Sequence, residues 1–337
     1  MKLETAKSAG FCFGVERAVD KAVELAARHG GVDAYGALIH NRDMMSRLEK
    51  SGVHTIESLD DAQSHVIIRA HGVPPSVINY LEGKGLSYTD ATCPFVTKIH
   101  RIVEEYTAKG FKLLVAGDKS HPEIIGIVGH CKTTAFTANS PFEMENLLVR
   151  ENILRENALI CIAQTTFNSE KWIESKKIIK KLCTNAKIFD TICNATISRQ
   201  SETQKLAQRC DLMIVVGGRE SSNTKKLAEI CEKYCRTKSV ENKTQIGPDI
   251  LEGLPLNGQI GITAGASTPA YIIKEVHERM DEIIKTADTA EESFEELFNQ
   301  SNDKIRVYIG NRVKATVISV NKTEVVVDLG TKHSGYI

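Results

Sequence analysis

Three cysteines, each directly ahead of a helical segment, constrain the fold of this chain more than any other feature. Phe11-Cys12-Phe13-Gly14 leads into VERAVDKAVELAA, Thr92-Cys93-Pro94 leads into FVTKIHRIVEEYTAKG, and Ile192-Cys193-Asn194 leads into ATISRQSETQKLAQR. The unpaired N–H groups and the dipole at a helix start favour an ionised thiolate, which is the form that binds metals. The repeated context therefore indicates three metal-ligating thiols, each at the start of a helix.

The spacing of these cysteines suggests three related units. Cys93 follows Cys12 by 93 − 12 = 81 residues, and Cys193 follows Cys93 by 193 − 93 = 100 residues, which is roughly the size of a small α/β unit. Three thiolates would hold a metal or cluster with one coordination position open, whereas a closed structural zinc site usually takes four protein ligands. An open position favours catalysis. The alternative is that each cysteine is an ordinary buried thiol, which is the better explanation of a lone cysteine.

Charge and hydropathy exclude several classes of function. In 337 residues, 43 Lys and Arg balance 43 Asp and Glu, so the chain as a whole has no basic field for nucleic acid or anionic membranes. The N-terminal residues lack an apolar stretch of signal-peptide length, and no run reaches the ~20 apolar residues of a membrane helix. We therefore expect a cytoplasmic protein of about two or three domains, whose nine cysteines are metal ligands or free thiols rather than disulfides.

Short apolar runs alternate with helical segments, which indicates an α/β fold. We expect strands at 33–39, 65–69, 112–115, 159–163, 212–216 and 259–263. In such folds, ligands bind outside the carboxyl ends of the strands. The segments after these strands carry polar side chains rather than packing groups: His40, His71, His121 with Glu123, Thr165, Ser221-Ser222-Asn223 and Ser267.

These polar residues predict one anion site. Ser221 and Ser267 each precede a helix, where hydroxyls and free N–H groups bind phosphate oxygens well. Taken singly, ordinary helix capping is the better explanation of each serine, and a buried or surface imidazole explains each histidine. Their shared position after strand ends favours a common anionic ligand. Glu123, two residues beyond His121, is then a candidate proton donor, although it could be only a helix-start carboxylate.

The other histidines and cysteines lack this context and are expected to be structural. They are His29, His54, His65, His100, His130, His277, His333, Cys131, Cys161, Cys183 and Cys210. Cys231 and Cys235 lie four residues apart, a spacing that a metal could use, but without partners we expect them to pack. The absence of GxxxxGK[ST], and of GxGxxG after a strand, argues against the usual nucleotide sites.

The sequence changes character near residue 284. Residues 284–303 are expected to form an acidic linker with room for some helix, because Thr286 to Asp303 holds six acids, no Lys or Arg and no sustained apolar stripe. The segment 304–337 carries six Lys or Arg against two Asp or Glu. It alternates apolar residues at Val313, Ala315 and Val317 and again at Val325, Val327 and Leu329, which predicts a β-hairpin of different origin.

The motifs together resemble the family of 4-hydroxy-3-methylbut-2-enyl diphosphate reductases of the non-mevalonate isoprenoid pathway. The resemblance rests on GFCFGVERAV, RAHGVPP, DATCPFVTKIH, SHPE, QTT, DTICNATISRQ, GGRESSNT and GAS, which occur in order over residues 1–283. It implies a cloverleaf of three α/β units, roughly 14–92, 93–190, and 1–13 with 191–283, around a central iron-sulfur cluster. Cys12, Cys93 and Cys193 would ligate an oxygen-sensitive [4Fe-4S] cluster whose fourth iron is open to substrate.

The resemblance also implies the reaction. Two electrons and two protons would convert the hydroxylated allylic diphosphate into isopentenyl and dimethylallyl diphosphate plus water, with the open iron as Lewis acid. Glu123 would supply a proton and Thr165 would orient the leaving hydroxyl. The residues implied to hold the diphosphate are His40, His71, His121, Ser221, Ser222, Asn223 and Ser267. Reduced ferredoxin or flavodoxin would donate the electrons.

The tail, GNRVKATVISVNKTEVVVDLGTKHSGYI, is similar to the opening half of the RNA-binding OB repeat of a small-subunit ribosomal protein. An OB barrel needs five strands, so 304–337 is expected to be an incomplete OB-like segment of a longer fusion protein, which would contact RNA or the ribosome in its complete form. Two other functions stay open. One is non-redox (de)hydration of an anionic substrate at an iron-sulfur cluster, and the other is RNA-binding regulation by a degenerate enzyme body.

Overall fold

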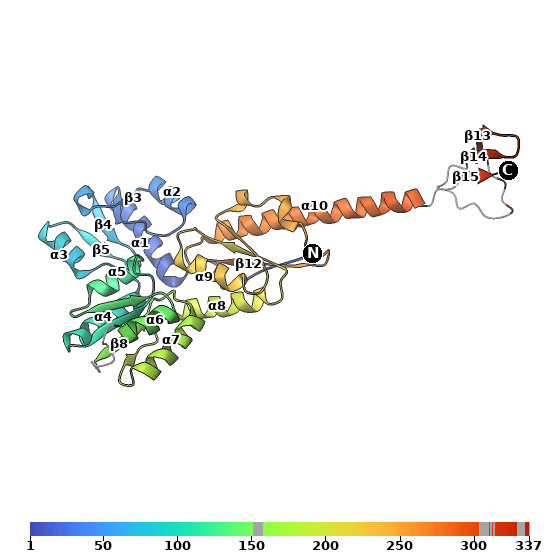
Figure 1. Ribbon diagram of the computed structural model, residues 1–337. Helices are drawn as coiled ribbons and strands as arrows, with labels where there is room; N and C mark the ends of the chain where they lie inside the picture. The colour runs from blue at the N-terminus through green and yellow to red at the C-terminus, as the bar shows by residue number, and fades with distance from the viewer. Residues whose placement is uncertain (151–157, 303–309, 311, 313, 329–333, 337) are drawn as a thin grey trace. The chain divides into compact units, whose positions relative to one another are not determined.

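The computed structural model of the chain describes residues 1–150, 158–302, 310, 312, 314–328 and 334–336. The chain divides into two compact units, Met1–Met280 and Asp281–Ile337. The first unit contains three parallel sheets of four strands each, which confirms the predicted α/β fold class (Figure 1). No helix among the described residues is both long enough and apolar enough to span a bilayer.

The first sheet has the strand order β3-β2-β4-β5. Its strands are β2 (Val32–Tyr35), β3 (Val53–Ile56), β4 (His65–Ile68) and β5 (Tyr88–Asp90). The helices around it are α1 (Phe13–His29), α2 (Arg42–Lys50), α3 (Pro75–Gly83) and a short 3-10 helix at Leu59–Asp61.

The second sheet has the corresponding order β7-β6-β8-β9. Its strands are β6 (Lys112–Ala116), β7 (Ala135–Ala138), β8 (Leu159–Ala163) and β9 (Lys187–Ile188). Its helices are α4 (Pro94–Ala108), α5 (Pro122–Gly129), α6 (Pro141–Arg150) and α7 (Ser169–Leu182).

The third sheet includes the N-terminal strand and has the order β1-β12-β10-β11. Lys2 to Thr5 pair in parallel with Gln259 to Ile262, so the two ends of the first unit meet in one sheet. Its strands are β1 (Lys2–Thr5), β10 (Leu212–Val216), β11 (Arg236–Val240) and β12 (Gln259–Ala264). The accompanying helices are α8 (Asn194–Ala207), α9 (Ser222–Cys231), α10 (Ala270–Asn302) and 3-10 helices at Lys243–Gln245 and Pro248–Leu251.

Because the three sheets share one strand order, the loops that follow corresponding strands occupy equivalent positions in each sheet. The two central strands of each sheet lie side by side, and the chain turns in opposite directions after them, so their carboxyl ends open a crevice for ligands. These central pairs are β2 and β4, β6 and β8, and β10 and β12. One edge strand of each sheet pairs with the second member of the central pair: β5 with β4, β9 with β8, and β1 with β12. Each of these edge strands is followed by a cysteine and then by the helix that leads to the next sheet.

In the described part of the first unit, the six predicted strands are all central strands, and the six that sequence reasoning missed are all edge strands. Central strands such as β8 and β10 are buried at every residue and therefore show as continuous apolar runs. Edge strands such as β11 have a mixed burial pattern and no such run. The strand expected over 33–39 ends earlier, at Tyr35, because Gly36 turns the chain with φ 68°.

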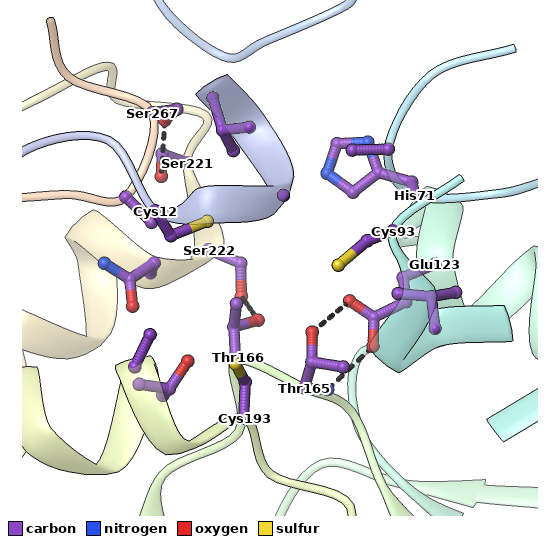
Figure 2. A pocket seen from close by; sticks show the side chains of 18 of the residues that line it. Cys12, His71, Cys93, Glu123, Thr165, Thr166, Cys193, Ser221, Ser222 and Ser267 are labelled. Carbon is purple, nitrogen blue, oxygen red and sulfur yellow. Dashed lines mark hydrogen bonds between the residues drawn. The ribbon is translucent and has the colours of Figure 1, made fainter. Parts of the chain in front are cut away.

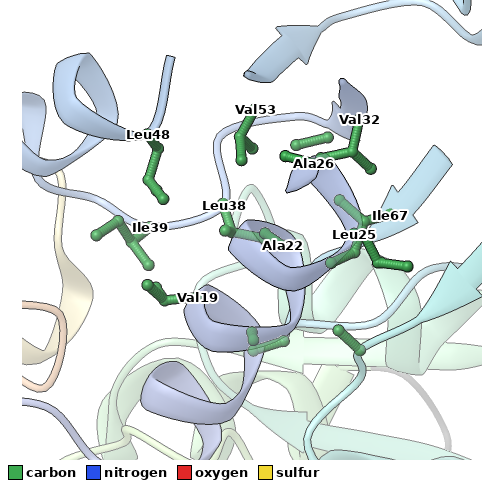
Figure 3. Close-up of a cluster of buried hydrophobic side chains, with 14 residues drawn as sticks. Val19, Ala22, Leu25, Ala26, Val32, Leu38, Ile39, Leu48, Val53 and Ile67 are labelled. Carbon is green, nitrogen blue, oxygen red and sulfur yellow. The ribbon is translucent and has the colours of Figure 1, made fainter. Parts of the chain in front are cut away.

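The core under the first sheet shows why α1 forms. Its buried residues include Ala18, Ala22, Leu25 and Ala26, which recur at helical spacing and pack against the sheet (Figure 3). The helix ends at Gly30 with φ 73°, a left-handed cap that glycine adopts without strain. Core packing thereby fixes the helix whose first residue follows Cys12.

The acidic segment is helical as far as the structure describes it. Residues 284–302, expected as an acidic linker with some helix, continue α10 as far as Asn302, and Asp303 lies outside the described residues. Alanine and glutamate are strong helix formers, which accounts for a helix here without a sustained apolar stripe. The predicted hairpin is present, with β13 (Thr316–Val320) antiparallel to β14 (Val325–Asp328).

A third strand, β15 (Ser334–Tyr336), pairs with β14 to complete a small antiparallel sheet. The described part of the tail thus has three strands, fewer than the five of an OB barrel. Val313 and Leu329, which belonged to the predicted alternation, lie outside the described residues.

Candidate active site

All the predicted site residues line one cavity in the first unit (Figure 2). They are Cys12, Cys93, Cys193, His40, His71, His121, Glu123, Thr165, Ser221, Ser222, Asn223 and Ser267. The histidines, the glutamate, Thr165 and the serines follow central strands, and the cysteines follow the strands beside them. The three sheets therefore bring residues more than two hundred positions apart to one place.

The three cysteines occupy equivalent positions. Each is the N-cap of its helix, with extended backbone and no side-chain capping bond, so the thiol does not cap its own helix. Each backbone N–H donates to a carbonyl just after a central strand: Cys12 to Ala266 O at 3.2 Å, Cys93 to Ala70 O at 3.0 Å, and Cys193 to Thr165 O at 3.0 Å. The same hydrogen bonds tie the cysteines to the loops that carry Ser267, His71 and Thr165.

The thiols are close enough to interact electrostatically. Burial raises the pKa of Cys93, and the neighbouring thiols of Cys12 and Cys193 raise it further, against the lowering effect of the Phe95 and Val96 N–H groups. All three cysteines are free and half-buried. A bound metal centre would ligate these sulfurs as thiolates and would remove the repulsion between them.

Gly14 leaves room for the Cys93 thiol. A Cβ built on Gly14 would lie 2.6 Å from Cys93 Sγ, so a methyl group there displaces the thiol. Gly83 in α3 is a matched position, because a Cβ there meets nothing within 4 Å.

We therefore predict that Gly14→Ala lowers the metal content per chain severalfold, although alanine favours helix formation by about 1 kcal/mol. Gly83→Ala should keep the metal content of the wild type. Metal content and melting temperature of the two variants are the measurement. Full metal content in Gly14→Ala would show that the thiol does not need the space.

The three histidines form a tight cluster. Ring centroids of His40 and His71 lie 5.3 Å apart, those of His71 and His121 5.2 Å, and those of His40 and His121 6.2 Å. One ring nitrogen of each lies within 4.8 Å of the others, close enough for a single polar group to contact all three. His40 Nε2 and His71 Nδ1 are buried and find no hydrogen-bond partner in the described part of the chain. Orphaned polar atoms of this kind indicate a missing ligand.

The histidines are neutral in the free protein. Burial lowers the pKa of His71 well below its usual value, and it lowers the pKa of His121 to about 3. Burial and the Arg69 guanidinium lower the pKa of His40. His121 Nδ1 accepts the Glu123 N–H at 3.1 Å, which leaves the proton of the neutral ring on Nε2. His121 thus presents a donor to an anion.

Glu123 is held by two hydrogen bonds from one residue. Thr165 N donates to Oε1 at 2.7 Å, and Thr165 Oγ1 donates to Oε2 at 2.7 Å (Figure 2). The side chain is buried, and burial raises its pKa, against the lowering effects of Thr165 and the Lys226 ammonium. A buried glutamate with a raised pKa is suited to general acid catalysis.

Hydroxyls and an amide form the wall contributed by the third sheet. Ser221 caps α9 by accepting the Thr224 N–H at 3.3 Å, and Ser267 Oγ lies 3.4 Å from Ser221 Oγ (Figure 2). Both amide atoms of Asn223 are buried, without a partner among residues that the structure describes. Gly218 approaches the His40 carbonyl so closely that a Cβ would lie 2.0 Å from it. Loops from the first and third sheets therefore meet around the same space.

Sequence reasoning missed three cations. Arg199 in α8 lines the cavity, the Arg69 guanidinium acts on His40, His71 and His121, and Lys226 Nζ in α9 donates to Ser222 Oγ at 3.0 Å. Burial lowers the pKa of Lys226 to about 8, against the opposing effect of Glu123. Arg69 directly follows a strand and could have been found by the rule used for the histidines. Arg199 and Lys226 look like ordinary helix-surface residues in sequence.

The residues expected to be structural lie outside this cavity, apart from His333, which is outside the described residues. Cys161, Cys210 and Cys231 are buried packing residues, and burial raises the pKa of each thiol. The rings of His100 and His130 stack at 4.0 Å, and His130 binds Glu104.

Comparison with known proteins agrees with this architecture. The family model described as "LytB protein" matches residues 3–281. The chain belongs to the LytB family. A 4-hydroxy-3-methylbut-2-enyl diphosphate reductase of Caldanaerobacter subterraneus is 40% identical over 287 residues, which cover 83% of this chain and 96% of that protein.

A second reductase, from Clostridium acetobutylicum, is 38% identical over 342 residues. The match covers 100% of this chain but 52% of that protein, so the chain spans about half the length of this longer LytB relative.

Two solved structures share the LytB fold. The structure of (E)-4-hydroxy-3-methyl-but-2-enyl diphosphate reductase, the terminal enzyme of the non-mevalonate pathway, is 36% identical with a TM-score of 0.61. It aligns with 84% of this chain and 100% of its own. The reductase from Plasmodium falciparum is 27% identical with a TM-score of 0.73, covering 81% of this chain and 86% of its own.

Proposed function

We propose that this chain is a 4-hydroxy-3-methylbut-2-enyl diphosphate reductase of the non-mevalonate pathway. It reduces the hydroxylated allylic diphosphate to isopentenyl and dimethylallyl diphosphate plus water. The observation that carries the proposal is the single cavity in which three thiols, three neutral histidines and a buried glutamate meet. Membership of the LytB family supports the same activity, because a relative aligned over most of its length is named as a 4-hydroxy-3-methylbut-2-enyl diphosphate reductase.

The residues present fit a [4Fe-4S] cluster with three protein ligands. Cys12, Cys93 and Cys193 are free, share the cavity and leave their thiols unused in capping. A cluster held by three thiolates keeps one iron for substrate. When bound, it supplies electrons and an iron that acts as Lewis acid on the leaving hydroxyl.

The histidines, Ser221, Ser222, Asn223 and Ser267 hold the diphosphate. Their orphaned polar atoms provide hydrogen bonds, and the Arg69 charge makes the region favourable for an anion. Because the three imidazoles are neutral before substrate arrives, they do not repel one another in the free enzyme. The diphosphate anchors the substrate so that its hydroxyl end reaches toward the cysteines.

Glu123 holds the proton for the reaction, and Thr165 positions it. The two hydrogen bonds from Thr165 fix the carboxyl group, and Thr165 lines the cavity beside Glu123, where its hydroxyl orients the substrate hydroxyl. After protonation of the leaving hydroxyl, the Lys226 charge stabilises the Glu123 carboxylate that remains. Reduced ferredoxin or flavodoxin supplies the electrons.

Anaerobic turnover tests this function against non-redox dehydration at the same cluster. With a reduced donor, the substrate should give both diphosphate products and consume two electron equivalents per product formed. Without the donor, the protein should form no more product than the electrons already stored in it can reduce. Continuous water loss or addition without a donor would overturn the reductase assignment.

We propose a separate RNA-binding role for the tail, 304–337. The alignment with the longer C. acetobutylicum reductase extends across the whole chain and so includes this segment. The tail's similarity to an OB repeat and its excess of basic residues support RNA as the partner.

Removing residues 304–337 should abolish the salt-dependent RNA binding that we propose for this segment. Cluster content and reductase turnover should stay unchanged, because every proposed site residue lies in the first unit. Filter binding over a salt series, with turnover on the same samples, is the measurement. Equal RNA affinity with and without the segment would contradict the role.

A further inference from the structure

Arg199 is a buried cation for which the reductase reaction described above has no role. Its side chain is 3% exposed, although arginine is rarely buried without a partner. It lies in α8, less than two helical turns beyond the N-cap Cys193, and it lines the cavity. A buried guanidinium is costly unless its donors are used and an anion balances its charge.

Two of its nitrogens hold the segment that carries Cys12. Nε donates to Ser8 O at 2.8 Å, and Nη2 donates to Gly10 O at 2.7 Å. Glu202, one turn further along α8, accepts the N–H groups of Lys7 and Ser8, each at 2.8 Å. The pair of side chains therefore binds both the donors and the acceptors of the loop between β1 and Cys12.

The third nitrogen is unused. Nη1 is buried and has no hydrogen-bond partner in the ranges that the structure describes. Burial lowers the pKa of Arg199, and the nearby sulfur groups of Cys12 and Cys193 oppose this effect more than Glu202 does. The free N–H group thus belongs to a cation that interacts electrostatically with two of the three cysteines.

We propose that Arg199 is a positioning residue for the metal centre that sets its reduction potential. It fixes Cys12 relative to Cys193 and directs one N–H group and a positive charge at the sulfur-bound group between them. Hydrogen bonds to cluster sulfurs and nearby positive charge favour the reduced, more negative state, and so raise the potential. A low-potential protein donor can then reduce the centre. The inference rests on the proposed cluster.

The test compares midpoint potentials of anaerobically purified protein by redox titration followed by electron paramagnetic resonance. Arg199→Met removes the charge and the donors, so reduction should become at least about tenfold less favourable, a potential more negative by ~59 mV for one electron. Arg199→Lys keeps the charge and should recover part of that shift. Glu202→Gln loosens the same loop without removing the cation. Because it also removes a negative charge, the potential should not become more negative in this variant.

If Arg199→Met does not assemble its cluster, Arg199→Gln replaces it in the same measurement of midpoint potential. Glutamine also removes the charge, but it can still donate a hydrogen bond to a loop carbonyl. An unchanged potential in a neutral variant that holds its full cluster would overturn the inference, even if its iron binds less tightly. An equal shift in Glu202→Gln would also overturn it, by assigning the effect to loop position alone. Wild-type protein without iron would instead refute the proposed function.

Discussion

Replacing Cys93 by serine is expected to remove the proposed iron-sulfur cluster and reduce reductase turnover to background. Serine keeps the N-cap position of α4 but lacks the soft thiolate that ligates iron. Two remaining cysteines cannot replace the ligand, because Cys12 and Cys193 are fixed by their own loops through hydrogen bonds to Ala266 and Thr165. Cys12→Ser and Cys193→Ser should behave in the same way.

The matched control is Cys131→Ser. Cys131 is free and half-buried like the three proposed ligands, but it lies outside the cavity, with Sγ 3.6 Å from Thr133 Oγ1. This variant should keep full iron and sulfide, as should serine at the remaining cysteines that fold normally. The measurements are iron, sulfide and the visible absorption of anaerobic samples. A cluster that survives unchanged in Cys93→Ser would rule out the three-cysteine site.

Replacing Glu123 by glutamine should lower turnover by ~10²–10⁴-fold, the usual contribution of general acid catalysis. Glutamine has nearly the same shape and can still accept the Thr165 N–H, but it has no proton to release. Iron content and substrate affinity should stay near wild type, because Glu123 is neither a proposed ligand nor a diphosphate contact. Single-turnover rates and KM separate these effects.

The control for this variant is Glu143→Gln, which alters an exposed glutamate that likewise accepts a backbone N–H, from Asn139 at 2.8 Å. It should leave turnover unchanged. Normal turnover in Glu123→Gln would remove Glu123 from the mechanism.

The wild-type pH profile follows from the same carboxyl group. Burial raises the pKa of Glu123, so the group keeps its proton to a higher pH than an exposed glutamate does. Turnover that needs the protonated form should be retained below this raised pKa and fall as the pH rises through it. The falling limb of the profile for wild-type enzyme should be absent from the residual activity of Glu123→Gln.

The central strands and the cavity residues were predictable because each has a local signature. A strand that is buried on both faces must be apolar throughout, and a polar loop at its carboxyl end then stands out. His71 after β4 and Ser221 after β10 were found in this way. The helix-starting cysteines were found because the same short pattern occurs three times.

The rest depends on contacts between distant segments. Arg199 and Lys226 each lie within a helix, and only the packed structure shows that the first faces two cysteines and the second lies beside Ser222 and Glu123. The N-terminal strand gave no apolar run, since it is an edge strand whose pairing with β12 is set by the assembled sheet. The length of helix in the acidic segment could not be read from its charge pattern, because that helix depends on the propensity of alanine and glutamate and not on an apolar stripe.

We propose that Cys12, Cys93 and Cys193 hold one iron-sulfur cluster in the cavity. Chemical analysis of iron and acid-labile sulfide per chain, on protein purified without oxygen, tests this proposal most directly. We expect about four iron and four sulfide per chain, the content of one [4Fe-4S] cluster. Protein that folds with neither iron nor sulfide, or with a single zinc in their place, would contradict it.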